Sequence, residues 1–274
     1  MATIAGRFFE PQRRPDLLSG TPRANAIDRW IYVFTAASFI LIVLTGFIPD
    51  SVMKIGLVRS GARPPFPLAM HVHAVLMGSF LLLFQAQTIL VATGRTETHK
   101  LLGRAAMVLV PALVVAGLVL AGVTYHNVWN GAHFGPPALR SSLLKDISTL
   151  DDILLMQLRI GILFPLFLGI GLSARLVDPG MHKRMMILGT ATALPAAFDR
   201  MTWLPSTFPE SAIGSDLYVL MAFSPMFLWD VLRNHRVHRA YWIWLAVYVP
   251  FMFLVYSQWD TPWWHSAAPR IMGL

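Results

Sequence analysis

The chain has 274 residues, of which 55% are hydrophobic and only 13% are charged. A soluble globular domain has about 25% charged residues, so this composition indicates a membrane protein. The chain contains no cysteine, which excludes disulfides, thiolate catalysis, cysteine-bound zinc and iron–sulfur clusters. The net charge of +8 does not indicate nucleic-acid binding, because the positive residues lie at the ends of apolar segments, where lipid headgroups are expected.

Seven apolar segments predict an all-α membrane fold. A helix needs about 20 apolar residues to cross the hydrocarbon of a bilayer, and most of the segments have that length. The expected spans are Trp30–Pro49, Leu68–Val91, Ala105–Thr124, Ile153–Leu176, Met185–Leu204, Leu217–Leu232 and Ala240–Trp259. We expect the longest loop at residues 125–151. The predicted regions are an N-terminal tail (1–28), a seven-helix membrane domain (29–259) and a C-terminal tail (260–274).

The positive charges predict the orientation of these spans. On alternating sides of the expected membrane lie 14 and six Lys and Arg residues, with two more inside spans. The richer side includes the N-terminal tail, and positive residues concentrate on the cytoplasmic side of membrane proteins. We therefore expect the N-terminus inside, the C-terminus outside, and anionic lipid at the cytoplasmic face. The polar N-terminal tail has no signal-peptide pattern, so the first span should direct insertion.

Two His-Lys pairs suggest an internal repeat. His99-Lys100 follows the second span, His182-Lys183 follows the fourth, and each pair opens the next helix. The pairs are 83 residues apart, and the same shift aligns Phe84 with Phe167. Two helical hairpins joined by a His-Lys turn predict a duplicated four-helix core made by spans two to five.

His71 and His73 begin the second span, on the predicted outer side. Ionisable residues at this depth are rare in membrane proteins and are candidates for function. Residues two apart on a helix point about 200° away from each other, so both can bind one metal ion only at an irregular helix start. The alternative is a pair of interfacial residues that bond to backbone or water. We expect His73 to face the bundle and His71 to face the loop.

The other histidines predict an outer and an inner cluster. His126 lies on the outer side, 27 residues after His99, which is about 40 Å along a helix, so one site cannot hold both. If the protein binds haem at the cytoplasmic side of the membrane, we expect His99 and His182 to be its two ligands. As an alternative, both inner histidines anchor polar helix ends in the lipid interface.

Two outer sites are predicted as alternatives. In one, a second b-type haem is held by His126 together with His73 or His71. In the other, a single copper, zinc or iron ion is held by His71, His73 and a third ligand, His126 or His133, since neutral imidazole binds all of these metals.

Charged residues also occur inside the fourth and fifth spans. Arg159 lies in the fourth span, and Asp199 and Arg200 lie near the outer end of the fifth. Because buried charges in membranes are usually paired, we expect an Arg159–Asp199 ion pair. Its alternative role is a clamp for an anion or a haem propionate, which a guanidinium can bind with two hydrogen bonds. Met201 is a further candidate axial ligand.

Three motifs carry a resemblance to known proteins. They are His71-x-His73, His99-Lys100-x-x-Gly103 and His182-Lys183-Arg184. In this combination the chain resembles a family of uncharacterised proteobacterial multipass membrane proteins, over spans two to five. The resemblance implies a location in the bacterial inner membrane and no particular activity. A more distant likeness is to the di-haem membrane cytochromes b, which implies haem in a four-helix core, although the histidines here lie nearer the helix ends.

These observations leave three hypotheses for the function. The first is a membrane redox protein with b-type haem, which transfers electrons or reacts with quinone. The second is a metal-binding protein or enzyme with an outer histidine site. The third is a non-catalytic subunit of a larger membrane complex, without a cofactor. A retinal protein is excluded because the seventh span has no lysine, and neither HExxH nor a glycine-rich phosphate loop is present.

Overall fold

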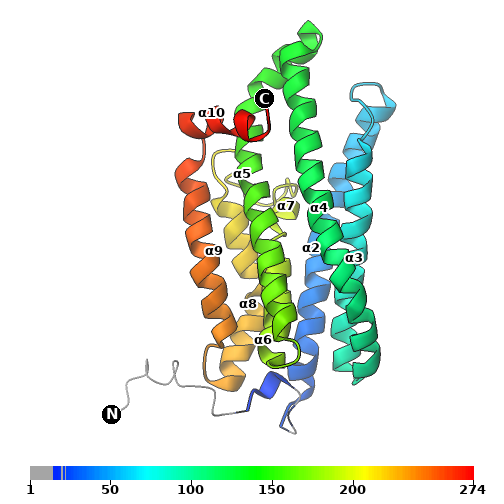
Figure 1. Cartoon of the computed structure of the whole chain (residues 1–274), viewed down its shortest axis with the longest axis vertical. Coiled ribbons are helices and arrows are strands. Elements are labelled where there is room, and N and C mark those ends of the chain that lie inside the picture. Colours follow the sequence, from blue (N-terminus) through cyan, green and yellow to red (C-terminus); the bar gives the residue numbers. More distant parts are fainter. Residues whose placement is uncertain (1–14, 20, 22) are drawn as a thin grey trace.

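The structure is a computed structural model that describes residues 15–19, 21 and 23–274. Three arginines of the predicted N-terminal tail, Arg7, Arg13 and Arg14, lie outside the described residues. The all-α prediction is confirmed, and six helices are long and apolar enough to cross a membrane. They are α2 (Ala26–Arg59), α3 (Leu68–Ala92), α4 (Thr96–Phe134), α5 (Pro137–Ala174), α8 (Ile213–Asn234) and α9 (Arg239–Gln258). We call the end of the bundle where α2 begins the lower end and the opposite end the upper end (Figure 1).

Local sequence signals determine where several helices begin and end. Asn25 accepts a hydrogen bond from the Asp28 backbone at 2.9 Å and donates its own backbone N–H to the Asp28 carboxylate at 2.8 Å, which forms a capping box at the start of α2. Gly94, with φ of +76°, follows the end of α3, in a left-handed conformation that glycine adopts without strain. Asp178 caps the N-terminus of α6 (Pro179–Ala191), and Pro179 occupies its first position.

Helices α4 and α5 are longer than the sequence predicts. With 39 and 38 residues, they extend about 57–58 Å and project beyond the other helices at the upper end (Figure 1). The predicted loop at 125–151 is therefore wrong. Polar and aromatic residues in that stretch suggest a loop, but the helix breaks only at Gly135 and Pro136, where proline removes a backbone donor and restricts the residue before it.

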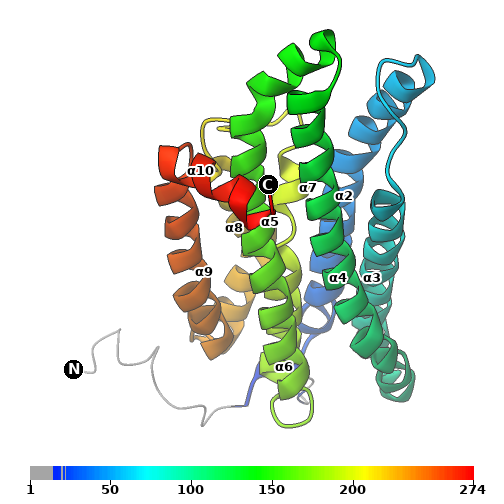
Figure 2. The same cartoon turned by 45° about the horizontal axis from the view of Figure 1, so that its top comes forward.

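The fifth predicted span, Met185–Leu204, is not one continuous helix. Helix α6 has 13 residues, a length of about 20 Å, and ends at Ala191. A turn at residues 192–194 separates it from the four-residue helix α7 (Pro195–Phe198). Proline at the start of α7 lacks the N–H that a continuous helix would need, which explains the break. The predicted C-terminal tail contains another helix, α10 (Pro262–Ile271), which lies across the upper end beside α5 and α9 (Figure 2).

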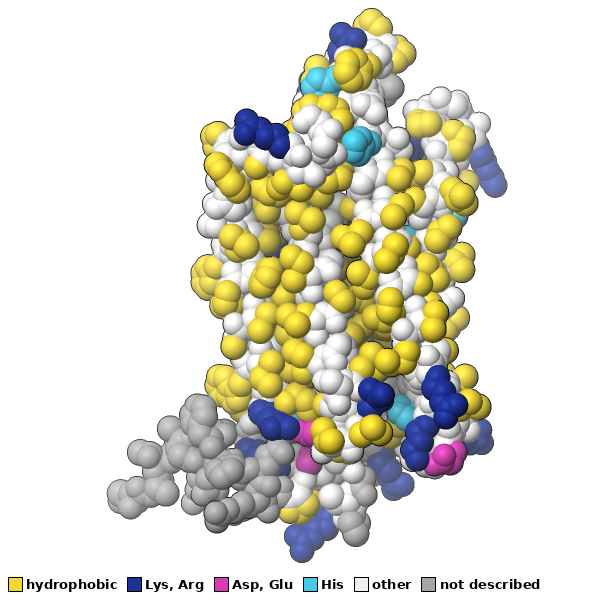
Figure 3. All heavy atoms as spheres, in the orientation of Figure 1, with side chains coloured by type: hydrophobic (Ala, Val, Ile, Leu, Met, Phe, Trp, Pro, Cys, Tyr) yellow, Lys and Arg dark blue, Asp and Glu magenta, His cyan; other side chains and the backbone are white. Residues whose placement is uncertain are grey.

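The largest cluster of buried hydrophobic residues lies around α6 and includes residues of α2, α8 and α9, which are outside the predicted four-helix core of spans two to five. Its fully buried side chains come from α2, α5, α6, α8 and α9, for example Phe39, Phe167, Leu188, Met226 and Trp244. Helices α3 and α4 lie at one side of this core, with 17% of their most apolar stretches buried, against 44% for α5. Their exposed faces are apolar, and the middle of the molecule shows mostly hydrophobic side chains (Figure 3). This belt suits lipid as the surrounding solvent.

Candidate functional site

His99 and His182 lie together at the lower end of the bundle. His99 is in the first turn of α4 and His182 in the first turn of α6, and their ring centres are 6.3 Å apart with ring planes at 75°. The Nδ1 atom of His182 lies 2.8 Å from the carbonyl oxygen of Gly171 in α5. If that nitrogen carries the proton, it donates to the carbonyl and leaves Nε2 to accept a hydrogen bond or bind a metal. The structure thus brings together the two residues of the predicted inner pair.

The His99 ring has an unsatisfied polar atom. Its Nδ1 is buried and makes no hydrogen bond, although the backbone of Gln87 in α3 faces the ring. Both amide atoms of Gln87 and the Oε1 atom of Gln85 are also buried without partners. A buried polar atom without a partner costs about 1–3 kcal/mol, so several such atoms together indicate a missing ligand or ordered water.

Gly103 leaves room for the Gln87 side chain on α4. A Cβ at this glycine would lie 3.8 Å from Gln87 Nε2, so no side chain separates the amide from the helix backbone. His99 and Gly103 are four residues apart and therefore lie on the same face of α4. The Gln87 side chain thus packs against the face that carries the His99 ring. We call His99, His182, Gln87 and Gly103 the lower histidine site. Gln87 lies in the second predicted span, whereas the other three members lie just before the third and fifth predicted spans.

His71 and His73 face in different directions, as their spacing predicts. The His73 ring packs against α4, where a Cβ at Gly117 would lie 3.5 Å from His73 Cε1, and its Nδ1 is buried without a partner. His71 is exposed and has its ring 6.2 Å from the Phe66 ring. The two side chains therefore do not converge on one metal ion.

The predicted outer haem pair is not assembled. His73 contacts α4 at Gly117, whereas His126 lies nine residues further along α4, a rise of about 13.5 Å. His126 instead has its Nε2 atom 2.8 Å from the carbonyl oxygen of Met272, after α10. This contact joins the C-terminal segment to α4 and leaves His73 without His126 as a partner.

The predicted outer metal site is not assembled either. His133 lies near the end of α4, where its ring stacks on Trp129 at 4.0 Å and its Nδ1 is 2.9 Å from the Trp129 carbonyl oxygen. Within the described part of the chain, one group of His and Asp side chains is close enough to share a metal ion. That group is Asp152, Asp260 and His265, and it contains none of the predicted ligands.

Arg159 is paired, but not with the predicted residue. Its guanidinium donates two hydrogen bonds of 2.8 Å to Asp216 in the first turn of α8. The hydroxyl groups of Tyr248 and Tyr256 in α9 donate to the same carboxylate at 2.5 and 2.6 Å. Both charged side chains are at most 3% exposed. Because both charged groups are paired with each other and the carboxylate accepts from two tyrosines, this cluster is a structural connection between α5, α8 and α9.

The predicted Arg159–Asp199 pair is therefore wrong. Asp199 accepts a hydrogen bond from Ser215. Arg200 lies over the Phe47 ring of α2, 4.4 Å from its centre, with Nε 3.5 Å from an oxygen of Asp50. These contacts link the segment after α7 to α2 and α8. They do not form an anion clamp with Arg159.

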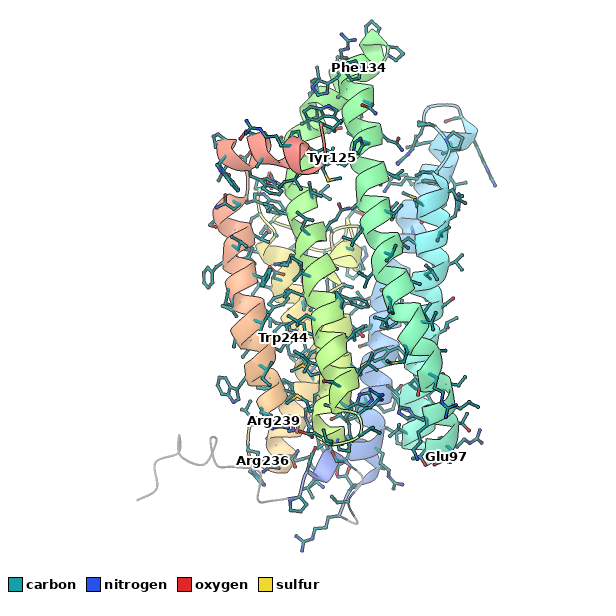
Figure 4. The ribbon with its side chains drawn as sticks, viewed as in Figure 1. Glu97, Tyr125, Phe134, Arg236, Arg239 and Trp244 are labelled. Carbon is teal, nitrogen blue, oxygen red and sulfur yellow. The ribbon has the colours of Figure 1, made fainter. Side chains whose placement is uncertain are left out.

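A second arginine network lies at the lower end, around Arg184 of the His182-Lys183-Arg184 motif. The Arg184 side chain is fully buried and binds Asp230 of α8 through Nε at 2.5 Å and Nη2 at 2.7 Å. Its Nη1 donates to Asp16 at 2.7 Å, next to the short helix η1 (Leu17–Ser19). Tyr241 and Asn234 also donate to Asp230, at 2.9 and 2.7 Å. Figure 4 shows the side chains of this end, with Arg236 and Arg239 labelled.

Two groups at the edge of this network have shifted pKa values. Burial by itself would raise the pKa of the Asp16 carboxyl, but the hydrogen bond and the charge of Arg184 outweigh burial and hold the pKa well below its usual range. Burial, together with the charge of Arg184, lowers the pKa of His238 to about 4. Asp16 therefore stays charged and His238 stays neutral near pH 7.

The Arg184 network had a weak signal in the sequence. Arg184 is the third residue of the His-Lys-Arg motif, and Asp230 is an acidic residue within the predicted sixth span, where charges are rare without a partner. The sequence gives the depth of each residue but not the side of the helix that faces a neighbour. The pairing is visible only in the structure.

No protein-family model matches the chain, and no curated protein or solved structure matches it either. The structure shows a helical protein with six candidate membrane spans, and the resemblance noted from the motifs is not extended by these comparisons.

Proposed function

We propose that the chain is an integral membrane redox protein that carries electrons at a b-type haem held by His99 and His182. The observation that carries this proposal is the meeting of the two rings at the lower end, although they are 83 residues apart in the chain. Two imidazoles that bind one metal ion from opposite sides, with about 2 Å from each nitrogen to the metal, have ring centres about 6 Å apart. The observed 6.3 Å agrees with that separation.

The residues present also fit such a ligand chemically. His99 Nδ1 has no partner, and the contact of His182 Nδ1 with the Gly171 carbonyl oxygen orients that ring and leaves Nε2 to bind a metal. Haem with histidine ligands supplies a one-electron carrier. The apolar side chains of the surrounding helices would keep water away from it.

A quinone headgroup in the lower histidine site is the second candidate. The unpaired amide atoms of Gln87 favour it, since a ring carbonyl can accept from the amide nitrogen and the buried surroundings suit an apolar ring. The apolar exposed faces of α3 and α4 would allow such a lipid-soluble molecule to approach from the membrane.

An absorption spectrum of the protein purified in mild detergent tests both candidates. A Soret band and reduced-state bands of b type are expected, and they should disappear in His99→Ala and His182→Ala. His71→Ala is the matched control, because His71 is exposed at the upper end and should retain the bands. A colourless protein contradicts haem binding. The quinone candidate would then be supported if solvent extraction of the original chain releases one quinone per chain. The same extraction of Gln87→Leu should release none.

We further propose seven membrane crossings, with α6, the turn and α7 as the fifth. The lower end would then be cytoplasmic and the C-terminus external, in a bacterial inner membrane. The support is that Lys and Arg gather at the lower end (Figure 3) and that α5 and α8 both run from the upper end to the lower end (Figure 1), so the segment between them must return. Positive residues at this end would also contact anionic lipid.

The absence of native cysteine makes the topology testable. Ser60→Cys lies at the upper end and Thr98→Cys at the lower end, and both positions are exposed. In intact bacterial cells, a maleimide that cannot cross the membrane should label Ser60→Cys, and it should label Thr98→Cys only after permeabilisation. The reverse pattern would contradict the proposed orientation.

A further inference from the structure

A group of metal-binding side chains lies at the upper end, away from the lower histidine site. Asp152 is in α5, Asp260 follows α9, and His265 is in α10. One ligand atom of each residue lies within 4.8 Å of the others. Figure 2 shows how α10 crosses the bundle beside α5 and the end of α9, which brings these three residues together from distant parts of the chain.

The His265 ring is oriented by a second carboxylate. Its Nδ1 atom is 3.0 Å from Asp151, and its Nε2 atom is directed to the other side, 3.1 Å from Asp260. Asp151 is itself held by the Tyr125 hydroxyl at 2.6 Å, and its backbone carbonyl accepts from the Trp264 indole at 2.7 Å. A carboxylate that binds the far nitrogen of a histidine is the usual support of a metal-bound imidazole, because it fixes the ring and its tautomer.

Asp152 supplies an independent indication of a missing cation. Its side chain is 3% exposed, and its one described hydrogen bond comes from the Asp260 backbone at 3.0 Å. No Lys or Arg of the described chain forms an ion pair with it. A buried carboxylate is costly unless a cation or several hydrogen bonds compensate its charge. Asp151 and Asp260 add further negative charge around the single imidazole.

The site is also accessible. A pocket of about 320 Å³ opens beside it, with Asp151 and His265 in its wall together with Trp129 and His133 from α4. An ion can therefore reach His265 from the solvent at the upper end, without crossing the membrane-facing surface.

We propose that Asp152, Asp260 and the Nε2 atom of His265 bind one divalent transition-metal ion of the zinc or manganese class. One imidazole and two carboxylates suit these metals, whereas calcium and magnesium prefer oxygen ligands alone. Three protein ligands leave a coordination position for water or a substrate oxygen. The site shares no residue with the lower histidine site, so it stands whether or not haem is bound there.

Calorimetric titration of the purified, chelator-treated protein with Zn²⁺ tests the proposal. One ion per chain should bind, and both Asp152→Asn and His265→Gln should weaken binding by more than tenfold. Asp151→Asn should weaken it about 10–100-fold, the effect typical of a residue that orients a ligand. Asp146→Asn is the matched control, since this aspartate lies on the same helix with an exposed side chain and should bind Zn²⁺ like the original chain.

Two further measurements separate this site from its alternatives. A His71→Ala/His73→Ala variant should bind Zn²⁺ unchanged, and loss of binding there would overturn the assignment. Equal affinity of Asp152→Asn, His265→Gln and the original chain would overturn it as well. If a ligand variant does not fold, Co²⁺ bound to the original chain decides: the intense visible bands of a four- or five-coordinate ion support the site, and a weak six-coordinate spectrum contradicts it.

Discussion

The two sides of the helix bundle differ in whether their buried polar groups have hydrogen-bond partners. On the side of α5, α6, α8 and α9, the buried guanidinium groups of Arg184 and Arg159 form ion pairs. Arg184 binds Asp230 and Asp16, and Arg159 binds Asp216. On the side of α3 and α4, polar atoms are buried without partners. Of the eight such atoms in the described residues, five belong to α3 and to the first turn of α4.

This difference separates structural groups from candidate ligand-binding groups. A buried ion pair whose hydrogen bonds are all made holds helices together, but it has no unused donor or acceptor to bind a ligand. A buried polar atom without a hydrogen bond lowers the stability of the fold. A ligand that supplies the missing hydrogen bond removes this cost, which favours binding at such an atom. We therefore call the side with the paired arginines the framework side, and the unpartnered histidine and glutamine atoms of α3 and α4 are candidates to bind a ligand.

The framework side should be the most sensitive to substitution. Arg184→Met leaves Asp230 and Asp16 buried without their cation, and removal of one partner from a buried ion pair costs about 3–5 kcal/mol. We expect this variant to unfold at a much lower temperature in detergent, measured by tryptophan fluorescence. Arg175→Met, on the exposed lower end of α5, is the control and should change stability by less than about 0.5 kcal/mol. Equal stability of the two variants would show that the Arg184 network is not structural.

The two aspartates near Arg159 should differ in their effect. Asp216→Asn removes the charge that compensates Arg159, and we expect a loss of about 3 kcal/mol. Asp199→Asn retains a side chain that can bond to Ser215, so its loss should be about 1 kcal/mol or less. Chemical unfolding of both variants side by side measures the difference. A larger loss in Asp199→Asn than in Asp216→Asn would instead support Asp199 as the partner of Arg159, as the sequence predicts.

The case of Asp216 shows what the sequence can and cannot predict here. Apolar length predicts the six long helices, because a bilayer sets their minimum length, and the His-Lys repeat predicts that His99 and His182 lie at the same end. Asp216 lies one residue before the predicted sixth span, so the sequence places it in a loop, although it belongs to the first turn of α8. Partner choice depends on how helices are rotated about their axes, and hydropathy does not encode that rotation.

The same limit explains the upper end. Helix α10 lies in a stretch too polar and too short to be identified as a membrane helix, so nothing in the sequence places His265 beside Asp152. The break after Ala191 is different, since Pro195 marks it locally. Proline inside membrane helices is often tolerated, as Pro111 and Pro165 are here, and the sequence alone does not distinguish the two outcomes.

On the α3–α4 side, removal of a polar group should increase the stability of the fold rather than lower it. Gln87→Leu replaces an amide whose two polar atoms are buried without partners, so the ligand-free protein should gain about 1 kcal/mol. The midpoint of thermal unfolding measures this gain. Gln258→Leu is the control, because that amide donates to Ser257 and its removal should not stabilise the chain. A loss of stability in Gln87→Leu would mean that the amide is a structural group like those of the framework side.

The smallest effect expected is a pH dependence of the framework side. Burial and the nearby Arg184 lower the pKa of His238 from 6.5 to about 4, in a surrounding that also holds Asp16, Asp230 and Asp178. The unfolded chain therefore binds a proton below about pH 6.5, while the folded chain does so only near pH 4. The contribution of His238 to stability is complete above pH 6.5 and is lost as the pH falls from 6.5 to 4. His238→Asn keeps an acceptor for the Ala240 backbone and should flatten this part of the curve, measured by unfolding between pH 4 and 8. An unchanged curve would contradict this role of His238, since the lowered pKa of the Asp16 carboxyl confines its own loss of stability to below about pH 4, outside the measured range.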